Sequence, residues 1–333
     1  MADSHSEVWQ NAVVHAVEDV AAGIRRIVLR PELPHPVRPG EHVDVRVTVD
    51  GAVQVRSYSV VDAAADGTEL AISVFRSPNS RGGSVFMHGL EAGQVLEITQ
   101  PLQNFPLRVG APAYVLLAGG IGITAIAGMA AMLRRLGADY RLVYVARSRA
   151  AMAYLDDLAA LHGDRLEAHV DDEGTSLDVP ALVAGVREDA ELYMCGPIRL
   201  MDAVRRAWAE RDLDRTSLRY ETFGNSGWFE AEPFTVRVPR LGVEAVVDSD
   251  ESMLEALERK GVDIMSDCRK GECGLCQVKV LALDGRIDHR DVFYSDRQKS
   301  AGAKMCCCVS RAVSADAGST PGAGPAVLTI DVP

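Results

Sequence analysis

The stretch SDCRKGECGLCQVKV, which covers residues 266–280, contains three cysteines in the spacing Cys268-x4-Cys273-x2-Cys276. This spacing is typical of plant-type [2Fe–2S] clusters, whose fourth thiolate comes from much later in the chain. Zinc is the competing metal, but structural zinc sites usually combine two Cys-x2-Cys pairs, or one such pair with histidines. Buried, inert cysteines are the third interpretation. The spacing favours an iron–sulfur centre.

Two glycines in the same stretch, Gly271 and Gly274, support this interpretation. Backbone N–H groups that point toward the sulfur atoms offset the negative charge of such a cluster. Glycine can adopt the backbone conformations that this requires, because it has no Cβ atom to clash.

The composition is that of an ordinary globular protein with more than one domain. The chain has 333 residues, of which 47% are hydrophobic and 25% charged, and this length fits two or three domains. A net charge of −12 argues against sequence-independent binding of nucleic acid, which requires clustered lysine and arginine. Seven cysteines, gathered mostly near the C-terminus, do not fit a secreted disulfide framework, so we expect a cytoplasmic protein.

Neither the start of the sequence nor its longest apolar run predicts association with a membrane. Residues 1–10, MADSHSEVWQ, lack the basic and apolar segments of a secretory signal. The apolar run at 113–133 is interrupted by glycines, so it predicts a strand, a turn and a helix in place of a membrane span.

Three segments with different patterns predict a multidomain protein. Residues 1–108 contain short alternating apolar runs between glycine and proline turns, which predicts an antiparallel β-barrel. Residues 109–226 alternate strands with helices, which predicts an α/β domain with a parallel sheet. Residues 227–333 combine a hairpin, a helix, the cysteine stretch and a last strand, which predicts an α+β domain. The polar stretch at 314–326 is expected to be a flexible surface loop.

Two stretches in the first segment suit a flavin. In RSYS, residues 56–59, the arginine can pair with a phosphate and the tyrosine ring can lie against an isoalloxazine. In SPNSRGGS, residues 77–84, a cation, close backbone N–H groups and a hydroxyl precede a predicted helix. A cross-strand pair on the barrel surface and a plain glycine turn are the structural alternatives.

Two stretches in the second segment suit a nicotinamide cofactor. In LLAGGIGITAI, residues 116–126, the glycines let the backbone approach a ligand, and Thr124 could cap the helix or bond a carboxamide. YMCGP, residues 193–197, also lies at the end of a strand, where α/β sheets bind ligands. Tight strand-to-helix packing and, for Cys195, a small apolar filler are the alternatives.

Together these stretches resemble a known family. The cysteine stretch, DHRD at 288–291 and CVSRA at 308–312 are similar to the C-terminal ferredoxin domain of the phthalate dioxygenase reductase family. That family is a branch of the ferredoxin–NADP reductase superfamily, and the resemblance extends along nearly the whole chain. It implies a flavin barrel (1–108), a nicotinamide domain (109–226) and a β-grasp ferredoxin domain (227–333). It also implies FMN as the flavin, with FAD as the alternative.

The resemblance selects the fourth ligand of the cluster. The segment KMCCCVSRA, residues 304–312, offers three cysteines, and spacing alone leaves the choice open. In the family the ligand directly precedes Val-Ser-Arg, which points to Cys308, with Cys306 as the alternative. By similarity, Cys268 and Cys273 hold one iron, and Cys276 and Cys308 hold the other.

The resemblance also carries cofactor-binding roles to particular residues. The expected flavin contacts are Arg56, Ser57, Tyr58, Ser59, Ser73, Val74, Phe75, Arg81, Gly82, Gly83 and Ser84. The expected nicotinamide contacts are Gly119, Gly120, Gly122, Ile123, Thr124, Arg147, Ser148, Cys195, Gly196 and Pro197. Phe223 is expected either to shield the flavin until the nicotinamide displaces it or to anchor the linker.

The residues after the second predicted α/β strand bear on the choice of nicotinamide cofactor. VARSR places Arg147, Ser148 and Arg149 where an acidic residue would bind a 2′-hydroxyl, so taken alone they favour a 2′-phosphate. The resembled family mostly uses NADH. We therefore expect NADH, with NADPH as the alternative.

The expected function follows from the order of the cofactors. A hydride carries two electrons, an iron–sulfur cluster accepts one, and a flavin can handle both. We expect a reductase that passes electrons from NADH through FMN and the [2Fe–2S] cluster to an external acceptor, with no catalytic side chain required.

The resemblance implies a terminal oxygenase as the acceptor. A Rieske non-haem iron oxygenase or O-demethylase that acts on aromatic compounds is expected, and a cytochrome P450 is the alternative. A non-catalytic redox or zinc-binding protein is the hypothesis from a different class. The chain is expected to be a monomer.

Overall fold

The computed structural model describes residues 7–78, 80–223, 226–316 and 325–332. Residue contacts divide the chain into two compact units, and each unit is described by itself. The first consists of Met1–Gly196 and Ala203–Glu221, and the second of Pro197–Asp202 and Thr222–Pro333. Within the described ranges, no helix has the length and apolar character needed to cross a membrane.

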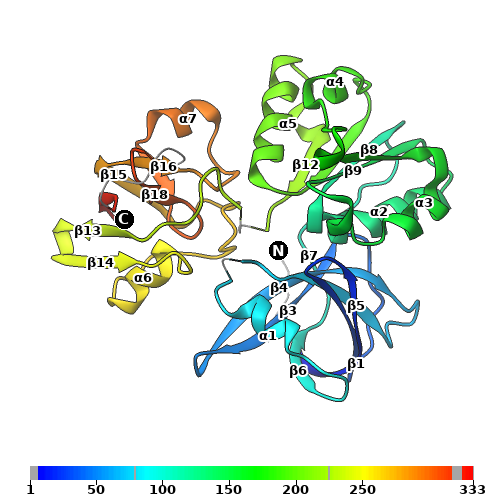
Figure 1. The fold of residues 1–333 in the computed structure, drawn as a ribbon, viewed down its shortest axis with the longest axis horizontal. Coiled ribbons are helices and arrows are strands. Elements are labelled where there is room, and N and C mark those ends of the chain that lie inside the picture. The colour runs from blue at the N-terminus through cyan, green and yellow to red at the C-terminus, as the bar shows by residue number, and fades with distance from the viewer. Residues whose placement is uncertain (1–6, 79, 224–225, 317–324, 333) are drawn as a thin grey trace, which may run out of the picture. The chain divides into compact units, whose positions relative to one another are not determined.

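An antiparallel barrel begins the first unit, drawn blue to cyan in Figure 1. Its strands pair in the order β4-β5-β2-β1-β6-β3-β7, and β4 also pairs with β3, which closes the barrel. In β3 the valines at 43, 45 and 47 are fully buried, as the alternation of a strand requires. The elements are β1 (Trp9–Ala21), β2 (Ile24–Pro31), β3 (Glu41–Val49), β4 (Ala52–Ala63), β5 (Leu70–Phe75), α1 (Gly83–His88), β6 (Val95–Thr99) and β7 (Leu102–Gln103).

A parallel sheet follows in the same unit, with the strand order β10-β9-β8-β11-β12. All residues of β8 are buried, as expected for a central strand covered on both faces. Helices α2 and α3 lie on one side of the sheet, and α4 and α5 on the other (Figure 1). The elements are β8 (Tyr114–Gly119), α2 (Ile123–Arg135), β9 (Tyr140–Ala146), α3 (Leu155–His162), β10 (Leu166–Val170), α4 (Val179–Ala184), β11 (Glu191–Cys195), α5 (Ile198–Glu210) and β12 (Leu218–Glu221).

A mixed sheet and two short helices form most of the second unit. The strand order is β14-β13-β19-β15-β17, in which β13 and β19 are parallel, and β16 pairs with β18 in a small separate sheet. Helix α6 buries Met253, Leu254 and Leu257 in the core of this unit. The elements are β13 (Phe234–Val238), β14 (Val243–Val247), α6 (Met253–Arg259), β15 (Gln277–Asp284), β16 (Arg286–Asp288), α7 (Asp296–Ala301), β17 (Lys304–Cys306), β18 (Arg311–Val313) and β19 (Val327–Asp331).

The expected fold class is confirmed: a closed antiparallel barrel, a parallel α/β sheet and a C-terminal α+β domain are all present. The division into three domains ending at residues 108, 226 and 333 stays a prediction, because the barrel and the parallel sheet fall within one compact unit. Most of the loop expected at 314–326 lies outside the described residues.

Candidate functional site

The carboxyl ends of β8 and β11 meet at one edge of the parallel sheet, and the predicted nicotinamide residues lie there. Residue Cys195 pairs with Ala118, and the following residues of both strands turn into loops. A Cβ atom on Gly122 would lie 2.1 Å from the carbonyl oxygen of Cys195, and one on Gly196 would lie 3.0 Å from Cα of Gly119. Only glycines allow the two loops to approach this closely, so both loops offer bare backbone to a ligand.

Thr124 does not cap helix α2, so this part of its predicted role is wrong. The N-cap position is Gly122, and the Thr124 hydroxyl donates to the carbonyl oxygen of Ile121 at 2.9 Å. Thr124 lies inside the first turn, because a short 3-10 segment precedes the helix. Its hydroxyl can still accept a hydrogen bond from a carboxamide.

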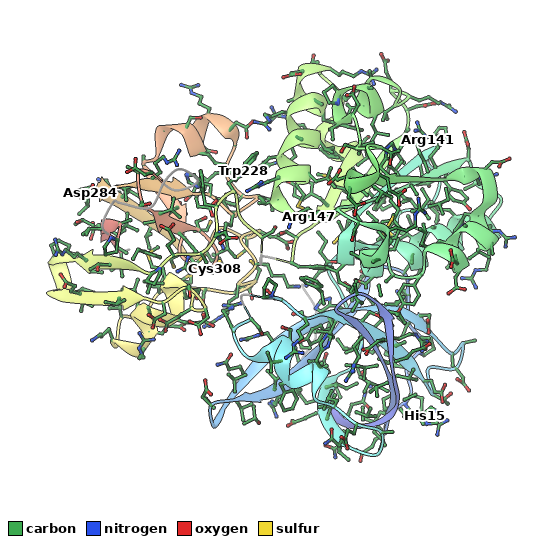
Figure 2. The ribbon with its side chains drawn as sticks, viewed as in Figure 1. His15, Arg141, Arg147, Trp228, Asp284 and Cys308 are labelled. Atoms are coloured by element: carbon green, nitrogen blue, oxygen red, sulfur yellow. The ribbon has the colours of Figure 1, made fainter. Side chains whose placement is uncertain are left out.

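The basic residues after β9 differ in their partners. Arg149 forms two hydrogen bonds to the carboxylate of Glu173, at 2.8 and 2.6 Å. The residues before Glu173 are Asp171 and Asp172, so an acidic segment lies beside this arginine. Arg147 is exposed and follows the end of β9, while Arg141 lies near its start; both are labelled in Figure 2. The positive charge that favoured a 2′-phosphate is therefore largely offset at Arg149.

In the barrel, the structure brings Arg56 of β4 against the glycine-rich loop. The Arg56 guanidinium donates to the carbonyl oxygen of Arg81 at 3.5 Å. A Cβ atom on Gly83 would lie 2.9 Å from Nε of Arg56, and one on Gly82, where φ is +80°, would lie 2.2 Å from Val49. The loop and the strand thus pack tightly enough to require both glycines.

The four residues RSYS divide between the two faces of β4, because side chains alternate along a strand. Tyr58 packs against the barrel core from the face that it shares with Arg56, and burial raises the pKa of its phenol. On the other face, the Ser57 hydroxyl donates to Asp44 at 2.5 Å, so it already has a partner within the barrel. Ser59 is buried.

Ser73, one of the flavin residues predicted on β5, makes a contact that the sequence did not predict. The hydroxyls of Ser73 and Tyr154 lie 2.5 Å apart and join β5 of the barrel to the N-cap residue of α3. Tyr154 has a φ of +63°, which is rare for a residue other than glycine. No local pattern in the sequence indicates this pair. Val74 is buried and Phe75 is exposed.

The cysteine stretch folds around the sulfur atom of Cys268. This sulfur accepts backbone N–H groups from Lys270, Glu272 and Cys273, each at 3.4 Å. Burial raises the pKa of the Cys268 thiol, and the three amide donors act against this by favouring the thiolate form, which is the form that binds iron. The loop therefore fits a ligand of a negatively charged cluster.

Both glycines of the stretch have the role that the sequence predicts. Gly271 has a φ of +78° and Gly274 a φ of +73°. A Cβ atom on Gly271 would lie 2.6 Å from Val309, and one on Gly274 would lie 2.3 Å from the ring of Phe293. Any side chain at either position would push the loop away from the core.

The other predicted ligands lie behind this loop. Hydrogen bonds from Cys306, Cys307 and Cys308 lower the pKa of the Cys276 thiol. Among these three cysteines, Cys308 also interacts with Cys268 and accepts the backbone N–H of Gly271, so it faces the loop (Cys308 is labelled in Figure 2). Cys306 and Cys307 are completely buried in the core. The choice of Cys308 as the fourth ligand stays a prediction.

No group of three or more His, Cys, Asp or Glu side chains within the described part of the chain is arranged around a single ion. A two-iron cluster does not need such a group, because four thiolates share two irons and each iron takes two of them.

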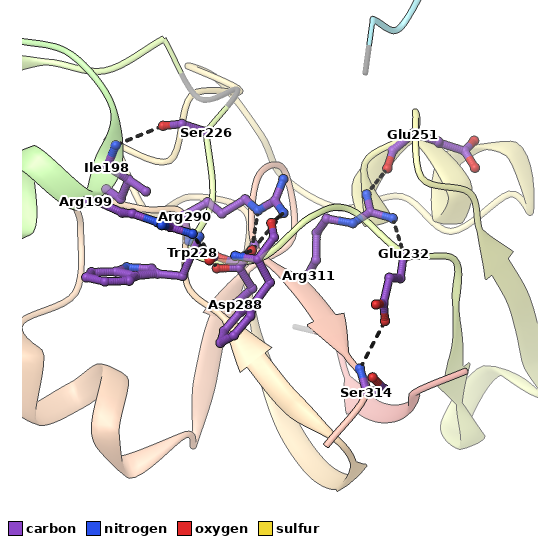
Figure 3. A network of polar contacts seen from close by, with 12 residues as sticks. Ile198, Arg199, Ser226, Trp228, Glu232, Glu251, Asp288, Arg290, Arg311 and Ser314 are labelled. Carbon is purple, nitrogen blue, oxygen red and sulfur yellow. Dashed lines mark hydrogen bonds and ion pairs between the residues drawn. The ribbon is translucent and has the colours of Figure 1, made fainter. Parts of the chain in front are cut away.

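Residues 222–233, which we call the linker, begin the longer segment of the second unit, and their described part is bonded on both sides (Figure 3). On one side, Asp288 accepts the backbone N–H groups of Trp228 and Phe229 at 2.9 and 3.5 Å, and its ion pair with Arg290 is buried. A Cβ atom on Gly227 would lie 2.4 Å from Nε of Arg290. The DHRD segment, which the sequence marked without a role, therefore holds the linker.

On the other side, the linker contacts the first turn of α5. The indole N–H of Trp228 donates to Asp202 at 3.2 Å, and Lys299 of α7 donates to the same carboxylate at 3.2 Å. The hydroxyl of Ser226 accepts the backbone N–H of Ile198 at 2.9 Å. That bond supplies a partner for one of the N–H groups that a helix leaves unpaired at its start.

The start of the linker contacts the cysteine stretch. The Glu272 carboxylate accepts the backbone N–H of Thr222 at 2.9 Å. Phe223 is half-buried beside it. The expected roles of Phe223 as a flavin shield or a linker anchor stay predictions.

Comparisons with known proteins bear on these sites. Residues 236–313 match the family described as the 2Fe-2S iron-sulfur cluster binding domain. The chain is 37% identical over 308 residues to phenoxybenzoate dioxygenase subunit beta of Ectopseudomonas oleovorans, covering 92% of this chain and 94% of that protein. The solved structure of phthalate dioxygenase reductase matches with a TM-score of 0.69 and 30% identity, over 97% of this chain and 98% of that one. An intact type IV self-sufficient cytochrome P450 monooxygenase matches with a TM-score of 0.64 and 34% identity, over 97% of this chain and 41% of that longer chain.

The chain is thus an oxidoreductase that joins a flavin and nicotinamide reductase fold to a ferredoxin domain. It belongs to the phthalate dioxygenase reductase-like family and is the reductase component of an oxygenase system. Its cofactors are FMN, a nicotinamide nucleotide and a [2Fe–2S] cluster, and its partner is a terminal oxygenase. The hypothesis of a non-catalytic zinc-binding protein is not retained.

Proposed function

We propose that this reductase delivers electrons, one at a time, from NADH to a Rieske non-haem iron oxygenase that acts on an aromatic compound. Bound FMN supplies the conversion between a two-electron hydride donor and one-electron carriers. The observation that carries the proposal is the cysteine stretch, in which three amides converge on Cys268 and Cys308 lies behind the loop. The similarity to phenoxybenzoate dioxygenase subunit beta supports the class of substrate.

We assign the cluster to Cys268 and Cys273 on one iron and to Cys276 and Cys308 on the other. In this assignment the side chains bind and position the cofactors, and none of them acts as a general acid or base. Arg56 and the loop Arg81–Ser84 would hold the flavin phosphate, and Tyr58 would contact the flavin ring. The glycines after β8 and the turn at Cys195 leave room for the nicotinamide.

Replacing Cys273 with serine tests the cluster and the function together. We expect the C273S protein to keep its flavin and to reduce ferricyanide with NADH at the wild-type rate, because a flavin can deliver electrons to that acceptor directly. Reduction of cytochrome c and electron transfer to the oxygenase should fall by about 100-fold or more, which corresponds to a loss of about 3 kcal/mol in transition-state stabilisation. Unchanged cytochrome c reduction would refute the assignment.

Supplying electrons to purified oxygenases tests which class of oxygenase this reductase serves. Purified reductase and NADH are combined with a Rieske oxygenase of aromatic acids or with a bacterial cytochrome P450, and product formed per NADH consumed is measured. Coupled turnover with the Rieske enzyme supports the proposal. Coupled turnover only with the P450 favours the second candidate function, a P450 reductase, which the similarity to the self-sufficient P450 monooxygenase supports.

We further propose a preference for NADH, because Glu173 already pairs with Arg149. In the E173Q protein the KM for NADPH should fall about 2- to 5-fold while the KM for NADH stays constant, since an exposed pair contributes up to about 1 kcal/mol. E167Q is the matched control, because its partner Arg141 lies near the start of β9. Equal effects of the two variants would contradict this explanation.

We also propose that the chain is a cytoplasmic monomer. All seven cysteines are free, which suits a reducing compartment. Analytical ultracentrifugation of the holoprotein at several concentrations tests the oligomeric state, and a concentration-dependent dimer would contradict it.

A further inference from the structure

Within the first unit, a short segment joins the parallel sheet to the barrel. Residues 148–154, which we call the bridging segment, follow β9 and lead directly into α3. The backbone N–H of Ala22, between β1 and β2, donates to the carbonyl oxygen of Ala150 at 2.7 Å. At the end of the segment, the hydroxyls of Tyr154 and Ser73 lie 2.5 Å apart. The bridging segment is therefore attached to the barrel at two points.

The backbone of Tyr154 has a conformation that is unfavourable for tyrosine. Its φ of +63° and ψ of +13° lie in the left-handed region, which glycine or asparagine adopts at lower cost. Tyr154 is the N-cap residue of α3, but its side chain makes no capping hydrogen bond. Backbone strain of this kind persists where surrounding contacts hold it, and it is common at functional sites. The contact with Ser73 is the feature that explains a tyrosine at this position.

The chemistry of the two hydroxyls is compatible with a flavin contact at Ser73. Burial raises the pKa of Tyr154, so the phenol keeps its proton and can donate it to Ser73. A serine hydroxyl that accepts this bond still has its own proton to donate. Arg26, which lies opposite Ser73 on β2, is paired with Asp62 at 2.9 Å. Tyr154 can thus hold Ser73 in place and leave its proton for a flavin.

The other end of the bridging segment lies at the expected nicotinamide site. Ser148 begins the segment, and it is among the residues expected to contact the nicotinamide cofactor. Between the two attachment points, Met152 and Ala153 are buried. The segment is therefore a packed connection, and a displacement at Tyr154 would be transmitted toward Ser148.

We propose that Tyr154 is a positioning residue for hydride transfer, which acts through Ser73 to hold the nicotinamide end of the parallel sheet at a fixed distance from β5. This inference rests on the proposed flavin and nicotinamide sites. Hydride transfer requires the donor and acceptor atoms to approach within about 3 to 3.5 Å, and a small misplacement slows it strongly. The Tyr154 hydroxyl belongs to neither cofactor site, so its contribution is to the distance between them.

The variants Y154F, S73A and Y154F/S73A of the holoprotein test the proposal. Stopped-flow reduction of FMN at several NADH concentrations gives the limiting rate and the Kd for NADH separately. We expect the limiting rate of Y154F to fall about 10-fold while its Kd for NADH and its FMN content stay at the wild-type values. The double variant should be no slower than the slower single variant, because both changes remove the same contact.

Hydrogen exchange supplies a readout that does not depend on activity. The amide of Ala22 should exchange faster in Y154F, because the second attachment of the bridging segment is weakened. The contact between α2 and β4 is unchanged in this variant, so the unit should still fold. Y140F is the matched control: the Tyr140 hydroxyl lies 2.7 Å from Nδ1 of His162, and Tyr140 begins β9 at the end away from the bridging segment. It should keep the wild-type limiting rate and the wild-type exchange of Ala22.

Three results would overturn this inference. A wild-type limiting rate in Y154F would show that the contact does not set the distance. Losses that add in the double variant would show that Tyr154 does not act through Ser73. Loss of FMN from Y154F, or a change confined to the Kd for NADH, would assign Tyr154 to cofactor binding. A wild-type protein whose FMN is not reduced by NADH would instead overturn the proposed function itself, and this inference with it.

Discussion

At the scale of single residues, the close approach of two backbone loops determines the nicotinamide site. Gly122 lies against the carbonyl oxygen of Cys195, and Gly196 lies against Gly119. A methyl group at either contact would have to displace main chain, which cannot move as a flexible side chain can. The nicotinamide site therefore depends on glycines, which contribute the absence of a side chain and no functional group.

Replacing Gly122 with alanine should damage this site while leaving the flavin bound. The new Cβ atom would lie 2.1 Å from the Cys195 oxygen, so the two strand ends must separate. We expect a stability loss of about 1–3 kcal/mol, typical of overpacking, and a reduction of FMN by NADH that is slower by about 10-fold or more. Stopped-flow absorbance measures the rate, and urea unfolding measures the stability.

Gly128 of α2 provides the control for this variant. The nearest atom to a Cβ there is 3.8 Å away, which is an ordinary contact. The G128A protein should keep the wild-type rate and gain up to about 1 kcal/mol, since alanine favours a helix interior over glycine. Similar rates in G122A and G128A would show that the close approach is unimportant.

A second residue-scale prediction concerns pH. Burial, and then the charges of Arg134 and Arg165, lower the pKa of His162, whose Nδ1 lies 2.7 Å from the Tyr140 hydroxyl. An unfolded chain takes up a proton at this histidine below about pH 6.5, whereas the folded chain resists it. The folded state is therefore destabilised as the pH falls through this range.

Urea unfolding, followed by flavin fluorescence at about pH 7.5 and about pH 5.5, measures this dependence. The H162Q protein should lose less stability between the two pH values than the wild type does. The exposed His15 serves as the control, and H15Q should behave like the wild type. A pH dependence that H162Q leaves unchanged would assign the effect to other groups.

At the scale of elements, the linker of the second unit is held by a buried ion pair. Asp288 is completely buried, and its carboxylate bonds both Arg290 and the backbone of Trp228. Removing one partner of a buried pair leaves the other charge without compensation, and this costs far more than losing an exposed pair. The linker thus depends on a contact that lies inside the ferredoxin domain.

The D288N protein should lose about 3–5 kcal/mol of stability in the ferredoxin domain. Visible circular dichroism of the cluster during urea unfolding measures this loss. E244Q in the same domain is the control: its partner Arg237 is exposed, so the change should stay within about 1 kcal/mol. Equal losses in the two variants would show that the linker contacts contribute little.

At the scale of the whole molecule, the chain contains separate hydrophobic cores. The barrel has its own core of buried residues, and α6 and the mixed sheet of the second unit enclose another. Chains with several cores commonly depart from a single cooperative transition. The two cofactor-bearing units therefore need not unfold together.

Unfolding followed by flavin fluorescence and by cluster absorbance should give two transitions with different urea midpoints. In the D288N protein only the cluster transition should move, since both of its altered contacts lie in the second unit. Coincident transitions in the wild type, or a joint shift in the variant, would show that the units unfold cooperatively.

The long elements were predictable because apolar residues recur along them with a clear period. The alternating valines of β3 and the fully apolar β8 indicate strands without any tertiary information. The two- and three-residue strands β7, β16 and β18 were not predicted, because so few residues show no period. Helix α7 was also missed, although the pattern Ser295 to Gln298 forms a capping box there.

The candidate sites were predictable where a motif is local and not where it joins distant segments. The cysteine stretch specifies its own loop, because its glycines and amides lie within a few residues of Cys268. The pairing of Ser73 with Tyr154 joins residues 81 positions apart, and that of Trp228 with Asp288 joins residues 60 positions apart. No local property of the sequence reports such contacts.

The sulfur of Cys268 is surrounded by main chain, and this has a practical consequence for engineering the protein. Lys270 and Glu272 offer it their peptide N–H groups, so these two hydrogen bonds do not depend on which side chains the positions carry. A neutral substitution at Lys270 that keeps the local backbone would therefore retain the hydrogen bond to this sulfur. The loss of the lysine charge would still shift the reduction potential of a bound cluster, because net charge near the sulfurs contributes to it.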